Sequence, residues 1–69
     1  MKNKLPERLQ ELRKEKNITR NQLMLKLRLG AETVRRWEDG ETIPNAEYIF
    51  MLCEFFGCSA DYLIGLKPD

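Results

Sequence analysis

Helix-start and helix-stop residues recur along the whole sequence. Thr19, Asn45 and Ser59 are residue types that cap helix N-termini, and Gly40 and Gly57 are of the type that follows helix C-termini. Between these positions, apolar residues return every three or four places, as they do along one face of a helix. No stretch alternates apolar and polar residues for long enough to predict a strand. The sequence therefore predicts an all-α fold.

The same signals give the expected bounds of five short helices. These are residues 6–16, 19–27, 31–39, 45–56 and 59–64. Asn17 is expected to end the first helix in the left-handed conformation, and Thr19 and Gln22 have the spacing of a capping box at the start of the second. Residues 28–30 form the expected turn between the second and third helices. Because 69 residues leave room for one small domain, we treat residues 1–69 as a single unit.

Composition excludes several kinds of function. The chain has no histidine, which argues against a histidine base or a His-ligated metal. The longest apolar run, Tyr48 to Cys53, is far shorter than the roughly 20 residues of a membrane span. No nucleophile and base stand in a recognisable arrangement. We therefore expect no enzyme, no metal, no cofactor, no membrane association and no small-molecule ligand.

The two cysteines fit a reducing compartment. Four residues separate Cys53 from Cys58, a spacing that matches neither a redox CxxC motif nor a paired zinc site. The basic start of the chain is followed by no apolar region, so no signal peptide is expected. We expect a cytoplasmic protein whose cysteines are reduced thiols in the core.

The net charge of +1 argues, taken alone, against a nucleic-acid-binding protein. Its distribution changes that interpretation. Residues 1–40 carry eleven basic and six acidic side chains, whereas residues 41–69 carry one basic and five acidic side chains. The N-terminal part is thus at +5 and the C-terminal part at −4, and the basic part is the candidate contact surface.

The chain from Thr19 to Gly40 predicts two helices joined by a short turn. Helices joined in this way cross steeply, so the second can project from the domain. At about 100° per residue, Val34 and Trp37 lie on the inner side of the third helix. Its outer side carries Ala31, Glu32, Arg35 and Arg36.

These outer side chains suit the edges of DNA bases. Arginine pairs with guanine, glutamate accepts from the cytosine amino group, and the small Ala31 permits close approach or contact with a thymine methyl group. In the alternative interpretation, Glu32 pairs with Arg35 and Arg36 at i+3 and i+4, and the face is only solvated surface.

The C-terminal part has more large apolar residues than a chain of this length can enclose. An exposed aromatic patch of this kind usually marks an interface. Much of the expected two-fold dimer contact is formed by Phe55, Tyr62, Ile64 and Leu66. The alternative is a set of scattered surface hydrophobic residues, which proteins tolerate.

From about Arg8 to Gly65, the sequence resembles the phage repressor/Cro-like (XRE-like) helix-turn-helix family. The resemblance implies a lambda-repressor-like fold of five helices that binds double-stranded DNA, usually as a dimer. The helix-turn-helix would span about residues 19–39, and the helices within 45–64 would supply core and dimer face. The segments that match the family pattern are Leu12-Arg13, Glu15-Lys16, Ile18-Thr19, Leu23, Thr33-Val34, Arg36-Trp37-Glu38-Asp39-Gly40, Ile43-Pro44 and Phe56-Gly57-Cys58-Ser59-Ala60-Asp61-Tyr62-Leu63.

The resemblance also assigns roles to single positions. It places Trp37 in the core, and it implies an architectural salt bridge between Arg13 and Glu38. The residues that match base-reading positions, some of which adjoin phosphates, are Ala31, Glu32, Arg35 and Arg36. The residues that match phosphate-contacting or backbone-positioning sites are Arg20, Gly30, Thr33, Gly40 and Thr42.

The sequence departs from the family pattern at four positions. Met24 stands where a small residue is usual, Arg28 where glycine is usual, Gly30 where a Ser/Thr cap is usual, and Glu41 where lysine is frequent. A left-handed residue other than glycine costs roughly 1 kcal/mol. Two alternatives follow for the turn: either Arg28 is left-handed, or Gly30 absorbs the bend instead. The second alternative would move the start of the third helix by a residue and leave open whether Ala31 or Glu32 reaches the groove. Glu41 is expected to weaken the attraction of its loop for DNA.

The resemblance implies a small bacterial or phage transcriptional regulator. The expected mechanism is repression by a homodimer that reads a pseudo-palindromic operator. The alternative is an antitoxin-like module that binds a protein partner through its aromatic C-terminal surface. Purification as a stable, operator-binding dimer without a partner would argue against that alternative.

Overall fold

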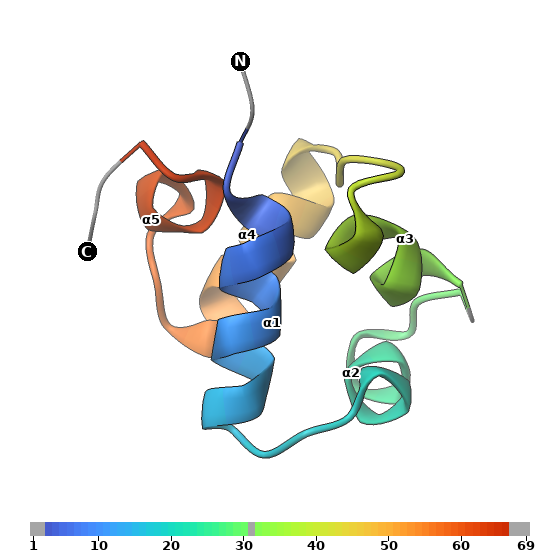
Figure 1. The fold of residues 1–69 in the computed structure, drawn as a ribbon. Coiled ribbons are helices and arrows are strands. Elements are labelled where there is room, and N and C mark those ends of the chain that lie inside the picture. Colours follow the sequence, from blue (N-terminus) through green and yellow to red (C-terminus); the bar gives the residue numbers. More distant parts are fainter. Residues whose placement is uncertain (1–2, 31, 67–69) are drawn as a thin grey trace.

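The computed structural model describes residues 3–30 and 32–66. Within these residues it contains five α-helices and no strand: α1 (Leu5–Glu15), α2 (Arg20–Leu27), α3 (Thr33–Asp39), α4 (Ala46–Phe56) and α5 (Ala60–Ile64). Figure 1 shows α1 in the middle of the molecule, with α5 on one side and α2 and α3 on the other. The all-α prediction is confirmed.

The core contains buried side chains from every helix. α1 packs against both α3 and α5, so its leucines lie at the centre of the core. Each fully buried side chain of this size stabilises the fold by roughly 1.5–3 kcal/mol relative to exposure. The buried apolar residues are Leu5, Leu9, Leu12, Leu23, Val34, Trp37, Leu52 and Leu63.

Side-chain caps begin three of the helices where the sequence predicted them. The Thr19 hydroxyl accepts from the Gln22 backbone N–H at 3.1 Å, and the Gln22 side chain accepts from the Thr19 N–H at 2.7 Å. Asn45 and Ser59 cap α4 and α5 in the same way, by accepting backbone N–H groups of the first turn. These caps satisfy donors that have no partner within the helix.

The N-terminal segment is tied to the end of α5. The Lys4 backbone N–H donates to the Ile64 carbonyl at 3.0 Å, and Arg8 Nη1 donates to the Tyr62 carbonyl at 2.6 Å. Gly65 makes this approach possible, because it has a φ of +91° and a Cβ there would collide with Lys4.

The turn between α2 and α3 adopts one of the two alternatives that the sequence left open. Arg28 itself adopts the left-handed conformation, at φ 56° and ψ 49°, and Gly30 does not replace it. The Leu29 N–H donates to the Met24 carbonyl at 2.9 Å and closes the C-terminal end of α2, and the Leu29 side chain packs against the core. The hydrogen bond and the burial of Leu29 together outweigh the strain at Arg28.

The third helix also begins later than predicted. α3 starts at Thr33, whose N–H donates to the Gly30 carbonyl at 3.1 Å, and Glu32 is its N-terminal flanking residue without a side-chain cap. The predicted first residue, Ala31, lies outside the described residues. The first helical i→i+4 bond of α3 runs from the Arg36 N–H to the Glu32 carbonyl at 3.0 Å, so the regular helix begins only after Glu32.

Replacement of Arg28 by glycine is expected to raise the free energy of unfolding by about 1 kcal/mol, because glycine has no Cβ to strain in the left-handed conformation. Urea unfolding followed by Trp37 fluorescence measures this change. Arg28→Ala is the matched control, since it removes the same side chain but keeps the Cβ. Equal gains from glycine and alanine would assign the effect to the arginine charge instead of backbone strain.

No helix among the described residues has both the length and the apolar character that crossing a membrane requires.

Candidate nucleic-acid interface

α2, the turn and α3 form a helix-turn-helix on one side of α1 (Figure 1). α3 is held from its inner side by Val34 and Trp37, which are 1% and 3% exposed. The Trp37 ring also contacts the Tyr48 ring of α4, with 5.6 Å between the ring centroids. The expected core position of Trp37 is confirmed, and the opposite side of α3 faces outward.

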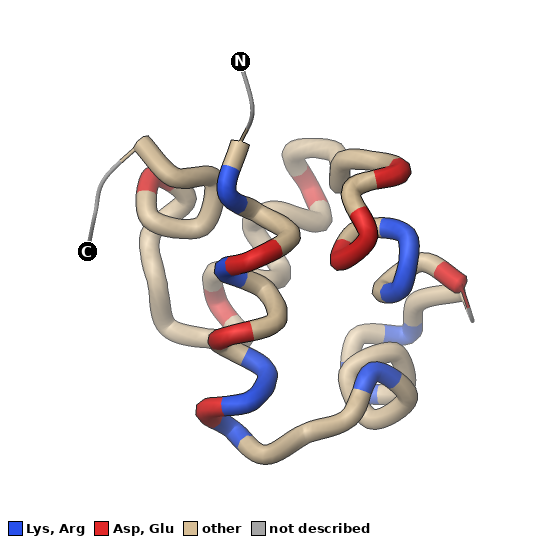
Figure 2. The backbone as a smooth tube through the Cα atoms, in the orientation of Figure 1, with Lys and Arg blue, Asp and Glu red and all other residues tan. Residues whose placement is uncertain are grey.

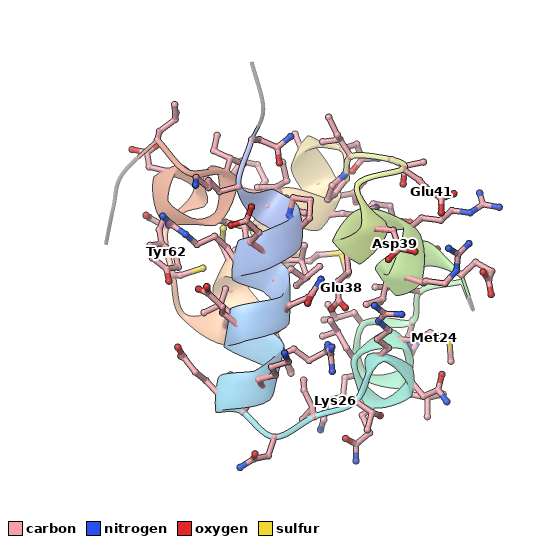
Figure 3. The ribbon with its side chains drawn as sticks, viewed as in Figure 1. Met24, Lys26, Glu38, Asp39, Glu41 and Tyr62 are labelled. Carbon is pink, nitrogen blue, oxygen red and sulfur yellow. The ribbon has the colours of Figure 1, made fainter. Side chains whose placement is uncertain are left out.

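A buried ion pair connects α3 to α1. Arg13 Nε donates to Glu38 Oε2 at 2.8 Å, and Arg13 Nη2 donates to Glu38 Oε1 at 3.2 Å. The Glu38 side chain is fully buried, and Figure 3 shows it between α1 and the helix-turn-helix. This bidentate pair is the one that the sequence predicted, and it fixes the position of α3 against the domain.

Arg20 contributes a second guanidinium to the same carboxylate. Its Nε donates to Glu38 Oε1 at 2.8 Å, and its Nη2 lies 3.9 Å from Asp39 Oδ1. Arg20 was expected to contact phosphate, and its role at the α2–α3 junction was not predicted from the sequence. The Arg20 side chain remains 41% exposed, so its outer edge is still accessible.

Arg35 lies among three carboxylates. Its Nε donates to Glu32 at 2.6 Å, and its Nη1 donates to Asp39 and to Glu41, each at 2.8 Å. These bonds raise the pKa of Arg35 above its ordinary value, with the bond to Glu32 the largest cause. The Glu32–Arg35 pair is the one that the alternative interpretation expected. The contacts to Asp39 and Glu41 were missed.

Arg36 differs from Arg35 and Arg20 because it forms no ion pair within the described residues. It is exposed on the outer side of α3, one turn before the helix ends. Arg28 and Lys26 are likewise exposed without an ion pair in the part of the chain that is described. Figure 2 shows basic positions on α2, in the turn and on α3, and acidic positions at the C-terminal end of α3 and in the loop after it.

The loop after α3 uses its backbone donors internally. The Gly40 N–H donates to the carbonyls of Arg36 and Trp37, and the N–H groups of Glu41 and Thr42 donate to the Arg36 carbonyl at 2.9 and 3.4 Å. The backbone N–H of Gly40 is therefore already bonded within the chain and is not available to a phosphate.

The expected dimer residues are only partly on the surface. Phe55, Tyr62 and Ile64 are half-buried and pack against the core of their own chain, whereas Leu66 is 63% exposed. The guanidinium of Arg8 covers the Tyr62 ring, 4.2 Å from its centroid. Figure 3 places Tyr62 on the opposite side of α1 from the helix-turn-helix.

Other large apolar side chains are more exposed than this patch. Ile43 and Phe50 are 67% and 66% exposed, and Leu25 of α2 is 71% exposed. Phe50 belongs to the apolar C-terminal part of the chain but was not among the expected dimer residues. The spacing of apolar residues along α4 does not by itself reveal which of its aromatic residues face the core.

Cys53 and Cys58 are free thiols. Burial raises the pKa of Cys53 to about 11, with a smaller contribution from Cys58, and burial likewise raises the pKa of Cys58. Both groups are therefore protonated at neutral pH, which suppresses their reactivity.

Comparison with known proteins agrees with this geometry. The helix-turn-helix family HTH_3 matches residues 9–63. The chain is also similar to the HTH-type transcriptional activator BcrR of Enterococcus faecalis, at 36% identity over 58 residues. That alignment covers 84% of this chain and 28% of the relative, so the chain spans about a quarter of the relative's length. The protein belongs to the XRE-type helix-turn-helix family of DNA-binding transcriptional regulators, which is not an enzyme family.

Proposed function

We propose that the protein recognises a specific double-stranded DNA sequence by inserting α3 into the major groove. The observation that carries this proposal is the exposed Arg36, which forms no ion pair within the described residues and stands on a helix held by Trp37 and Glu38. A rigid helix with a free guanidinium can present two donors to guanine, the commonest specific contact in DNA recognition.

The other predicted site residues take supporting roles in this proposal. Arg35 and Glu32 flank Arg36 as further base-reading candidates, together with Ala31. Arg20, Thr33 and Thr42 can reach phosphates beside the groove, and Gly30 and Gly40 allow the backbone to approach DNA closely. Phosphate contacts of this kind fix the register of the protein on the duplex, whereas base contacts specify the sequence.

We further propose that two copies bind a two-fold symmetric operator. Dimers of this class place their recognition helices about 34 Å apart, in successive major grooves. Phe55, Tyr62, Ile64 and the exposed Leu66 form the proposed contact between copies. This face suits the task because Tyr62 lies across α1 from the helix-turn-helix, so a dimer formed there leaves α3 uncovered (Figure 3).

Repression is the proposed outcome of binding. Occupying an operator that overlaps a promoter is sufficient to block transcription, whereas activation requires an additional contact with the transcription machinery. The relative BcrR carries the name of an activator. A reporter gene placed behind the selected operator tests whether binding represses or activates transcription. Increased expression on adding the protein would overturn the proposal of repression.

The experiment for the proposed function is a selection from random duplex DNA with the purified full chain. The proposal expects an enriched motif with two related half-sites. An enriched motif without two-fold symmetry would remove the dimer but keep DNA recognition. Absence of any enriched motif at low salt would overturn the proposal.

Replacement of Arg36 by alanine is expected to lower affinity for the selected operator by about 1–3 kcal/mol per half-site and to relax the preference at one base pair. Titration of the operator and of variants at each position measures both effects. Arg28→Ala is the control, because it removes another exposed guanidinium that stands outside α3. An equal loss from Arg36→Ala on operator and on random DNA would make Arg36 a phosphate contact only.

A further inference from the structure

The carboxylates around Arg35 come from three places in the chain. Glu32 precedes α3, Asp39 ends it, and Glu41 lies in the following loop. All three bond to the same guanidinium, at 2.6, 2.8 and 2.8 Å. Figure 3 shows Asp39 on α3 and Glu41 in the loop that follows it, on the opposite side of α1 from Tyr62. The cluster therefore lies on the face that the proposed function brings to DNA.

The hydrogen bonds leave Arg35 with few free donors. A guanidinium carries five N–H groups, of which one is on Nε and two are on each terminal nitrogen. Nε donates to Glu32, and Nη1 donates to both Asp39 and Glu41, which leaves the two hydrogens of Nη2. A fork on guanine or phosphate takes donors from two neighbouring nitrogens. Arg35 can form that fork only by releasing at least one carboxylate.

The net charge of this cluster also disfavours contact between Arg35 and the DNA backbone. One guanidinium among three carboxylates leaves the cluster with a net charge of −2. The four side chains are between 37% and 60% exposed, so their field reaches the solvent in front of α3. A phosphate backbone approaching this face meets a repulsive cluster instead of a free arginine.

We propose that Glu41 is a specificity-determining residue that keeps Arg35 off the DNA backbone and so holds down affinity for non-specific DNA. This inference rests on the proposed function. Glu41 is the informative member of the cluster because its side chain bonds only to Arg35 within the described residues. Asp39, in contrast, also lies near Arg20, and Glu32 adjoins the start of α3.

The test measures binding of wild type and Glu41→Gln to a random-sequence duplex over a series of salt concentrations. In Glu41→Gln, the amide keeps an acceptor but loses the charge, so residue 41 holds Arg35 less strongly and Arg35 can gain one phosphate contact. Affinity is expected to rise about fivefold to tenfold at 0.1 M salt, and the slope of log K against log salt is expected to steepen by about 0.9. Glu54→Gln is the matched control, because it removes the same charge from an exposed residue of α4.

A double-mutant cycle separates release of Arg35 from a general change of charge. In an Arg35→Ala background, Glu41→Gln is expected to change affinity by no more than the Glu54→Gln control does. An equal gain with and without Arg35, or a gain no larger than the control's in the wild-type background, would overturn the inference. If wild type binds neither a selected operator nor random duplex at low salt, the proposed function itself fails. If wild type binds DNA and Glu41→Gln changes nothing, only the role of Glu41 fails.

Discussion

Replacement of Glu38 by alanine is expected to lower the free energy of unfolding by about 3–5 kcal/mol. The Glu38 side chain is fully buried and accepts from Arg13 and Arg20. Without it, Arg13, whose side chain is only 14% exposed, retains a charge that neither carboxylate nor solvent balances. Arg20 loses less because its side chain is 41% exposed. A small domain has about 5–15 kcal/mol of stability, so this loss is a large part of the total.

Urea unfolding followed by circular dichroism measures the loss. Glu47→Ala is the control, because Glu47 is exposed and forms no ion pair within the described residues. Glu38→Gln is expected to fall between wild type and Glu38→Ala, since the amide keeps an acceptor but loses the charge. A loss below about 1 kcal/mol for Glu38→Ala would mean that water solvates both guanidiniums in the folded state.

Much of the fold could be predicted from sequence signals that act over short distances along the chain. The caps at Thr19, Asn45 and Ser59 act within one helical turn, so residue type and spacing are sufficient to predict them. Trp37 was predictable from helical phase together with the family pattern. The Arg13–Glu38 pair joins residues 25 positions apart, and the family resemblance supplied it where periodicity could not.

Predictions failed or were incomplete where distant contacts decide the outcome. The strain at Arg28 favoured a bend at Gly30, but closure of α2 and burial of Leu29 prevail over that local preference. The partners of Arg20 and Arg35 include residues beyond one helical turn, namely Glu38 and Glu41. Their meeting depends on how α2 and the loop after α3 pack, which sequence spacing does not encode.

Replacement of Leu23 by alanine is expected to lower the free energy of unfolding by about 2–5 kcal/mol. α2 lies entirely within the described residues, and Leu23 is its one fully buried side chain, at 0% exposure. Met24 and Leu27 are only half-buried against the same core. Loss of Leu23 therefore removes the main apolar contact that holds α2 beside α3, and operator binding should weaken together with stability.

Leu25→Ala is the matched control for this change. It deletes the same side chain from the same helix, so the change in helix propensity is the same, but Leu25 is 71% exposed. Its effect on unfolding is expected to stay within about 0.5 kcal/mol. The difference between the two variants therefore isolates burial of Leu23. Similar losses of unfolding free energy in the two variants would mean that another surface covers Leu25 in solution. A sedimentation measurement of the Leu25→Ala variant would then show whether that surface belongs to a second copy of the chain.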